Sequence, residues 1–129
     1  MKTVILDTDF LVHCASFKID YIEELKRILD FNYKVFIIDK TVDELDSIIE
    51  NQRGRAKADA KLAKATLKAL NIPEIKTKKD KIVDELIIRN ITKETIVATM
   101  DADLKRKLKL KSIPIVVIRQ KKYLKLFNY

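Results

Sequence analysis

Four short runs of mostly β-branched residues recur along the chain, and the segments between them carry apolar residues at helical spacing. The runs span residues 4–6, 35–38, 96–98 and 115–118. Uninterrupted apolar runs of this length are typical of strands that are buried on both faces. Parallel strands need a long crossover, which a helix supplies, so strands that alternate with helices form parallel sheets. The pattern predicts an α/β fold with a central parallel sheet covered by helices.

The expected helices fill the segments between these strands. They span residues 10–17, 21–29, 42–50, 55–70, 82–89 and 103–108, and a weaker strand is expected near residues 74–76. The chain has 129 residues, and a single domain typically has about 150. We therefore expect a single domain over residues 1–129.

Scarce residue types exclude several classes of site. The one glycine, Gly54, cannot form the glycine-rich turns that bind dinucleotides or the phosphates of nucleoside triphosphates. The one histidine, His13, cannot form a two-histidine metal site, and the one cysteine, Cys14, excludes an internal disulfide. Both lie in an apolar helical stretch, where packing is the favoured interpretation. Carboxylates remain as the abundant chemical groups, with cation binding and acid–base roles as their natural uses.

The expected compartment is the cytoplasm. A lone cysteine is typical of a reducing environment. No run of about 18 uncharged apolar residues could cross a membrane. Asp7 and Asp9 interrupt the apolar run near the N-terminus, so no signal peptide is expected.

Charge is distributed unevenly. Residues 1–50 hold 6 basic and 11 acidic side chains, whereas residues 51–129 hold 21 basic and 8 acidic ones. A basic surface attracts polyanions because binding releases their condensed counterions. Nucleic acid is therefore the leading partner class, and a solvated lysine-rich surface is the alternative.

Acidic residues follow the predicted strands. Asp7 comes directly after the first apolar run, and Asp101 lies just beyond the third. Glu44 lies near the start of the helix after the second run, and Asp84 near the start of the helix expected at about Asp80. In open parallel sheets the functional crevice lies beyond the carboxyl ends of the strands, so all four carboxylates can face one edge.

Carboxylates gathered at one edge would repel one another, at about 4 kcal/mol for a pair 4 Å apart in an effective dielectric near 20. A divalent cation removes this cost. Mg²⁺ or Mn²⁺ prefers oxygen ligands and is often bound between carboxylates and substrate phosphates. One or two such ions fit the hydrolysis of a phosphodiester without a histidine base.

Helix capping offers a simpler interpretation of these acids. Thr41 and Glu44 have the spacing of a capping box, which is the favoured interpretation of that pair taken alone. Asp80 is expected to be an N-cap, and Asp101 or Asp103 could cap the helix that follows. Asp84 could be a first-turn carboxylate favoured by the helix dipole, and Asp7 could belong to a capping turn.

Four segments in order resemble the motifs of PIN domain nucleases. Residues 4–11, Val-Ile-Leu-Asp-Thr-Asp-Phe-Leu, are similar to the first motif, hydrophobic-Leu-Asp-Thr-Asn-Phe, and residues 42–45 resemble Val-x-Glu-Leu. Residues 83–87 are similar to Ala-Asp-Asp-x-Ile, and residues 97–106 resemble Val-Ala-Thr-x-Asp-x-Asp-Leu-Lys-Arg. Asp9, Glu85 and Met100 depart from the residues usual in the family.

The resemblance implies a three-layer α/β/α sandwich with strand order 3-2-1-4-5 and a Mg²⁺- or Mn²⁺-dependent endoribonuclease. It implies the catalytic and metal-binding residues Asp7, Glu44, Asp84 and Asp101, supported by Thr8, Asp9, Thr99 and Asp103. The candidate RNA-binding residues are Arg53, Arg55, Lys57, Lys105, Arg106, Arg119, Lys121 and Lys122.

Within the family, residues 103–106 and the strand after Pro114 are most similar to the archaeal and eukaryotic branch that processes precursor small-subunit ribosomal RNA. Ribosomal precursor RNA is therefore the expected partner, with a homodimer and assembly proteins left open. The alternatives are a catalytically silent RNA-binding domain of ribosome assembly and the toxin ribonuclease of a toxin–antitoxin pair. Silent members usually lose one of the four acids, and all four are present.

Overall fold

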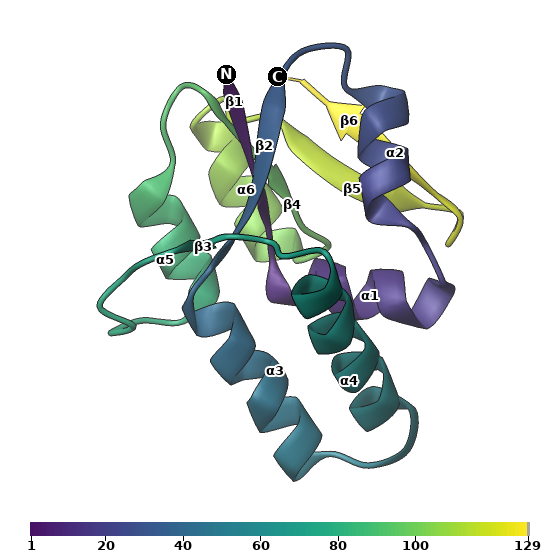
Figure 1. Ribbon diagram of the computed structural model, residues 1–129. Helices are drawn as coiled ribbons and strands as arrows, with labels where there is room; N and C mark the ends of the chain where they lie inside the picture. Colours follow the sequence, from purple (N-terminus) through teal and green to yellow (C-terminus); the bar gives the residue numbers. More distant parts are fainter. Residues whose placement is uncertain (129) are drawn as a thin grey trace.

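A six-stranded sheet forms the centre of the computed structural model, which describes residues 1–128 (Figure 1). The strands lie in the order β3-β2-β1-β4-β5-β6. They are β1 Lys2–Leu6, β2 Tyr33–Ile38, β3 Glu74–Ile75, β4 Thr95–Ala98, β5 Ile115–Arg119 and β6 Tyr123–Phe127. Neighbouring strands are parallel except β5 and β6, which are antiparallel. The predicted α/β fold and the order 3-2-1-4-5 are confirmed, with one strand added at the edge.

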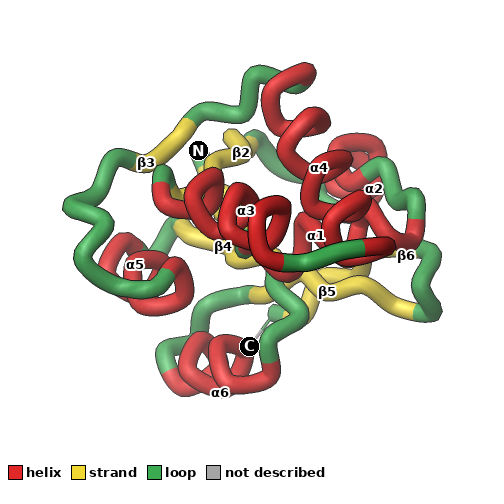
Figure 2. Tube along the Cα trace, turned by 90° about the horizontal axis from the view of Figure 1, so that it is seen from below, coloured by secondary structure: helices red, strands yellow, loops and turns green. Residues whose placement is uncertain are grey.

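Helices cover both faces of the sheet, which gives the three expected layers (Figure 2). Helices α1 to α4 pack on one face, and α5 and α6 pack on the other. They span α1 Thr8–Phe17, α2 Tyr21–Ile28, α3 Lys40–Asn51, α4 Gly54–Ala69, α5 Val83–Asn90 and α6 Ala102–Leu110. Among residues 1–128, no helix is both long and apolar enough to cross a membrane.

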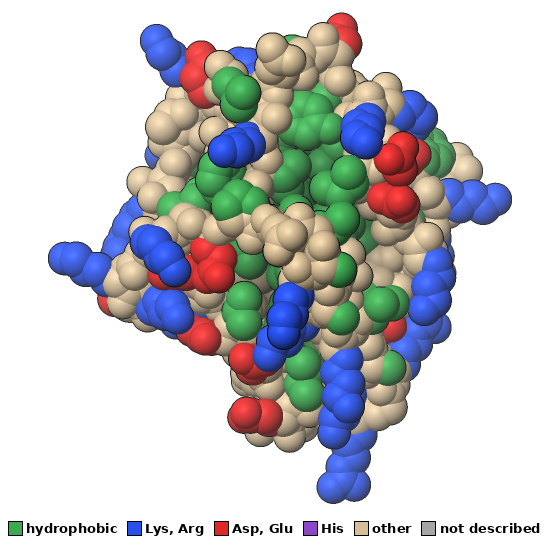
Figure 3. Space-filling view, viewed as in Figure 1, with side chains coloured by type: hydrophobic (Ala, Val, Ile, Leu, Met, Phe, Trp, Pro, Cys, Tyr) green, Lys and Arg blue, Asp and Glu red, His purple; other side chains and the backbone are tan. Residues whose placement is uncertain are grey.

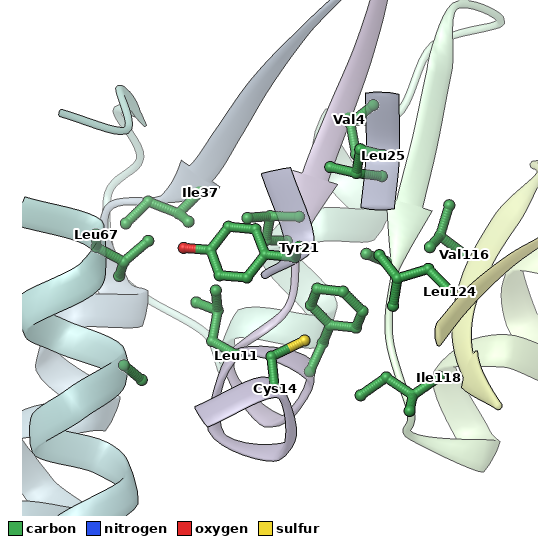
Figure 4. Packing of buried hydrophobic residues seen from close by; sticks show 14 of the residues in the cluster. Val4, Leu11, Cys14, Tyr21, Leu25, Ile37, Leu67, Val116, Ile118 and Leu124 are labelled. Carbon is green, nitrogen blue, oxygen red and sulfur yellow. The ribbon is translucent and has the colours of Figure 1, made fainter. Parts of the chain in front are cut away.

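Strand β1 shows why the apolar runs are continuous. Val4 and Leu6 point into the core under α1 to α4, where Val4 lies near Leu25 (Figure 4). Ile5, between them, points into the core under α5 and α6. Alternate side chains thus enter two different cores, so the buried part of β1, residues 4–6, is apolar at every position. The register also pairs Leu6 with Ala98, so β1 and β4 end side by side.

Two of the expected helix caps are wrong. Helix α3 begins at Lys40, and Thr41 lies fully buried within it, so its hydroxyl does not cap the helix in a box with Glu44. The Thr41 hydroxyl instead accepts a hydrogen bond from the Thr8 hydroxyl, 3.4 Å away. Helix α5 begins at Val83, and Asp80 lies before it as the ion-pair partner of Arg89, at 2.9 Å.

Strand β6 was not expected from the sequence. It follows a turn over residues 119–122, which is closed by the hydrogen bond from the Lys122 N–H to the Arg119 carbonyl. The two central residues, Gln120 and Lys121, have φ of 53° and 56°, as in a type I′ turn. Asparagine and glycine normally occupy these left-handed positions, because other side chains are strained there. The usual sequence signal of a tight hairpin is therefore missing.

Replacing Gln120 by Asn and Lys121 by Gly should stabilise the hairpin, because both new residues accept the left-handed backbone already present. We expect the free energy of unfolding to rise by about 1 kcal/mol in urea titrations. The control is Lys122→Gly in the same turn, where φ is not positive and the extra chain freedom should lower stability. A double variant no more stable than the wild type would show that the turn is not strained.

Candidate functional site

A cavity of about 480 Å³ opens at the carboxyl edge of the sheet, between α1, α3 and α5. Five carboxylates contribute to its wall, and we call it the carboxylate pocket. They are Asp7, Asp9, Glu44, Asp84 and Asp101. The rest of the wall is mainly apolar, with Val12, Ile48, Ile82 and Val83. The structure thus brings together in one cavity the four acids that the sequence singled out.

The Thr99 hydroxyl links the two acids that follow β1 and β4. It donates a hydrogen bond to Asp7 Oδ2 at 2.8 Å and accepts one from the Asp101 N–H at 3.0 Å. The other oxygen of Asp7 accepts from the Thr8 N–H at 2.9 Å. Thr99 is fully buried, so this linkage is shielded from water. It fixes Asp7 and sets the start of the turn that presents Asp101.

Asp7 is only 6% exposed, and its surroundings disfavour its charge. Burial, then the charge of Asp9 and a hydrogen bond with it, raise the pKa of Asp7 to about 8, against the lowering effect of its bonds to Thr99 and Thr8. Asp9 in turn accepts a 3.4 Å hydrogen bond from the Met100 N–H. In the metal-free protein at neutral pH, Asp7 therefore holds a proton that it would have to lose to act as an anionic ligand.

Glu44 and Asp84 form the opposite side of the pocket. Glu44 Oε2 accepts from the Val83 N–H at 3.3 Å, which ties α3 to the start of α5. Asp84 Oδ1 is buried and has no hydrogen-bond partner among residues 1–128. Its other oxygen lies 3.9 Å from Lys107 Nζ. A buried carboxylate oxygen without a partner is costly, and a cation or a water molecule is the kind of group that would satisfy it.

Helix N-termini offset part of the negative charge. Asp7 and Asp101 are the N-caps of α1 and α6, and the Asp101 side chain accepts from the Leu104 N–H at 2.8 Å. Asp84 lies in the first turn of α5, as expected. The positive ends of three helix dipoles therefore meet the acids at this edge. The capping interpretation of Asp7 and Asp101 holds, and it is compatible with a binding role.

The donor set fits a hard divalent cation, because the charged groups of the pocket are carboxylates and one buried oxygen is unpaired. The side chains are not gathered around one point. In the described part of the chain, no three Asp, Glu, His or Cys side chains are grouped closely enough to hold an ion. The residue chemistry is therefore suitable for a metal, and binding one would require the carboxylates to move toward it.

The predicted supporting residues divide into two groups. Thr8 and Asp9 line the pocket, and Thr99 is hydrogen bonded to Asp7. Asp103 is absent from the pocket lining found among residues 1–128. Its half-exposed carboxylate pairs with Arg106 and with Lys107, the latter at 3.1 Å.

None of the predicted RNA-binding residues is among the described residues that line the carboxylate pocket. Arg55 and Lys121 contact the C-terminal end of α1. A second cavity, of about 400 Å³, lies beside α6 and is lined by Lys105, Arg106 and Arg119. Arg53, Lys57 and Lys122 complete the set: Arg53 and Lys122 are exposed, and Lys57 is half-buried. Lys and Arg side chains project around the rim of the face shown in Figure 3.

His13 is the functional candidate that sequence reasoning missed. It is half-buried and lines the carboxylate pocket, whereas Cys14 packs in the core as expected. Its Nδ1 lies 2.7 Å from the Asp9 carbonyl oxygen. The available signal was its spacing, because residues four apart share one face of a helix and Asp9 precedes His13 by four.

Comparisons with known proteins agree with the geometry. The family model of a PIN like domain matches residues 4–121. Ribonuclease VapC4 of Methanocaldococcus jannaschii is 33% identical over 133 residues, which cover 99% of this chain and 98% of that protein. The solved structure of the PIN domain endonuclease Utp24 superposes with a TM-score of 0.78 at 24% identity, covering 98% of this chain and 92% of that one. At that identity the superposition bears on the fold alone.

The raised pKa of Asp7 predicts how stability depends on pH. The folded protein binds this proton more tightly than the unfolded chain, so the stabilisation is complete below about pH 4 and is lost as pH rises through about 8. Each pKa unit corresponds to about 1.4 kcal/mol. In metal-free buffer, Asp7→Asn should remove this part of the pH dependence.

Denaturant titrations between pH 4 and pH 9 measure the effect as the difference between the wild type and Asp7→Asn. Asp30→Asn is the matched control, because it removes a carboxylate from an exposed position. The same slope in the wild type and in Asp7→Asn would contradict the assignment.

Proposed function

The chain belongs to the family of PIN like domains, and from this membership we propose that it is a divalent-metal-dependent endoribonuclease. The observation that carries the proposal is the carboxylate pocket, in which four separate elements bring acids to one cavity beside a buried, unpaired oxygen of Asp84. The relative named Ribonuclease VapC4, which matches nearly the whole chain, supports RNA as the substrate class.

We infer that one or two Mg²⁺ or Mn²⁺ ions would be held by Asp7, Glu44, Asp84 and Asp101, which are also the proposed catalytic residues. When bound, such an ion supplies a Lewis acid that polarises a phosphate oxygen and makes water a stronger nucleophile. The protein's own contribution is the placement of these carboxylates. Thr99 holds Asp7 through one oxygen, and the Asp101 backbone is bonded to the same hydroxyl.

Protonation of Asp7 is part of this proposal. Ligand oxygens must be deprotonated to bind a cation well, so metal binding displaces the proton that burial and Asp9 favour. Asp9 contributes a further negative charge beside Asp7 in the position where the family usually has asparagine. Cation affinity should therefore rise with pH near neutrality.

The alternative of a silent RNA-binding domain is disfavoured by the same pocket. A domain that only binds RNA has no use for a buried, unpaired oxygen at Asp84 or for the raised pKa of Asp7. Both features cost stability in the free protein. Costs of this kind are typical of functional sites, where perturbed groups gather.

RNA is the proposed partner, and the excess of basic residues after residue 50 supports it. We propose precursor small-subunit ribosomal RNA as the substrate, on the resemblance of residues 103–106 and the strand after Pro114 to that branch of the family. The relative's name supports a ribonuclease without choosing the RNA. We also propose that the chain acts as one domain, since a single sheet runs from β1 near its start to β6 near its end.

Replacing Asp7 by Asn tests the enzymatic proposal. The change keeps the size of the side chain and removes one charge from the pocket, so the fold should survive. Cleavage should fall at least a hundredfold, because loss of a ligand costs several kcal/mol of transition-state stabilisation and each 1.36 kcal/mol is worth tenfold. The measurement is cleavage of a precursor ribosomal RNA fragment, a mature ribosomal fragment and a transfer RNA with Mn²⁺ or Mg²⁺.

Asp30→Asn and the wild type with chelator serve as controls. Asp30→Asn should cut like the wild type, and chelator should stop cleavage. Equal cleavage by every sample would identify a contaminating nuclease. A folded wild type that cuts none of the RNAs would favour the silent RNA-binding domain, and cutting of all three alike would favour the toxin ribonuclease.

A further inference from the structure

One face of α1 leads out of the carboxylate pocket. Asp9, His13 and Phe17 succeed one another at intervals of four residues and so share a stripe of the helix. Asp9 and His13 line the pocket, and the His13 ring lies 5.9 Å from the Phe17 ring between centroids, tilted by 46°. At 1.5 Å of rise per residue, the stripe is about 12 Å long. Successive stacked nucleotides of one strand are ~3.4 Å apart, so the stripe is long enough to contact more than one nucleotide.

Two cations from other elements close the far end of this stripe. Arg55, in the first turn of α4, donates to the Ser16 hydroxyl at 2.6 Å and to the Ser16 carbonyl at 3.1 Å. Lys121, in the turn before β6, places its Nζ 5.7 Å from the centre of the Phe17 ring. Segments far apart in sequence thus converge on the last turn of α1, with positive charge beside an aromatic ring.

The segment that delivers Lys121 is strained. Gln120 and Lys121 both have left-handed backbones, although neither is glycine or asparagine. Positive φ also occurs in the described chain at Lys18, Asn71, Lys79 and Ser112, so the position that this turn gives Lys121 is what bears on function. Placing the ammonium group of Lys121 over Phe17 is the visible consequence of the turn.

We propose that this stripe of α1 is the path by which an unpaired RNA strand reaches the carboxylate pocket. Bases stack on the rings of His13 and Phe17. Arg55 and Lys121 bind the phosphates on the side away from the pocket, with Lys121 moving from the Phe17 ring to a phosphate as a base takes its place. The position of the cut rests on the proposed function, whereas the binding path does not.

The arrangement selects unpaired RNA for a physical reason. Aromatic side chains accept the flat face of a base, which is available in single strands and is covered by neighbouring bases in a duplex. Cations alone would bind both forms, because both carry phosphates. The rings of His13 and Phe17 therefore predict a preference that Arg55 and Lys121 could not produce.

Binding in chelator tests the path without cleavage. The probes are a fluorescein-labelled eight-nucleotide RNA and the same sequence annealed to its complement, followed by fluorescence anisotropy at several salt concentrations. We expect Phe17→Leu to weaken binding of the unpaired RNA about tenfold, to leave the duplex unchanged, and to preserve the salt dependence. Lys121→Gln should weaken both RNAs and lower the logarithmic salt slope of the unpaired RNA by about 0.7.

The chain contains matched controls in strand β2. Lys34 Nζ lies 6.0 Å from the centre of the Phe36 ring, the same kind of pair as Lys121 and Phe17, and both pairs join an exposed lysine to a half-buried ring. Phe36→Leu and Lys34→Gln should bind both RNAs like the wild type. His13→Asn removes the second ring from a half-buried position and should repeat the effect of Phe17→Leu in a variant that does not touch the core.

The path is overturned if Phe17→Leu and His13→Asn, folded by circular dichroism, bind unpaired RNA as tightly as Phe36→Leu does. It is also overturned if the wild type does not prefer unpaired RNA. A wild type that shows the expected binding pattern and cuts none of the ribosomal and transfer RNAs of the cleavage test with Mn²⁺ supports the path and overturns the proposed function.

Discussion

The structure depends on one buried carboxylate at the end of a strand that has both faces covered. Val4, Ile5 and Leu6 fix β1 in the centre of the sheet, so Asp7 emerges beside the end of β4 with almost no access to water. The Thr99 hydroxyl and the start of α1 hold it there. Because this carboxylate is buried and Asp9 lies beside it, the group is most stable with a proton or a cation, and this preference connects the fold to the proposed chemistry.

The other acids extend the same constraint. Glu44 accepts a hydrogen bond from the first N–H of α5, and Asp101 caps α6. Asp84, in the first turn of α5, lies 3.9 Å from Lys107 Nζ. Helix dipoles compensate part of the charge, which explains how several acids can line one cavity in a folded, metal-free protein. Compensation is incomplete, as the unpaired oxygen of Asp84 shows for the described residues. A cation, bound alone or together with a phosphate-bearing ligand, would supply the missing partner.

The sequence predicts most of the scaffold, because the apolar runs of β1, β4 and β5 and the acids that follow strands are local patterns. It does not predict β6, since the left-handed turn at Gln120 and Lys121 lacks the residues that normally mark one. The capping box of Thr41 and Glu44 fails because both side chains find partners in other elements, Thr8 and Val83. His13 was misjudged for the same reason: its exposure to a cavity depends on α3 and α5, which local sequence does not place.

The most direct test of the central claim is the titration of the Asp7 side-chain carbonyl carbon by NMR, with and without Mg²⁺. In the metal-free protein this carbon should titrate with a pKa of about 8, and the midpoint should move to lower pH when Mg²⁺ binds and displaces the proton. A metal-free Asp7 that titrates near pH 4, or a midpoint that ignores Mg²⁺, would contradict the account.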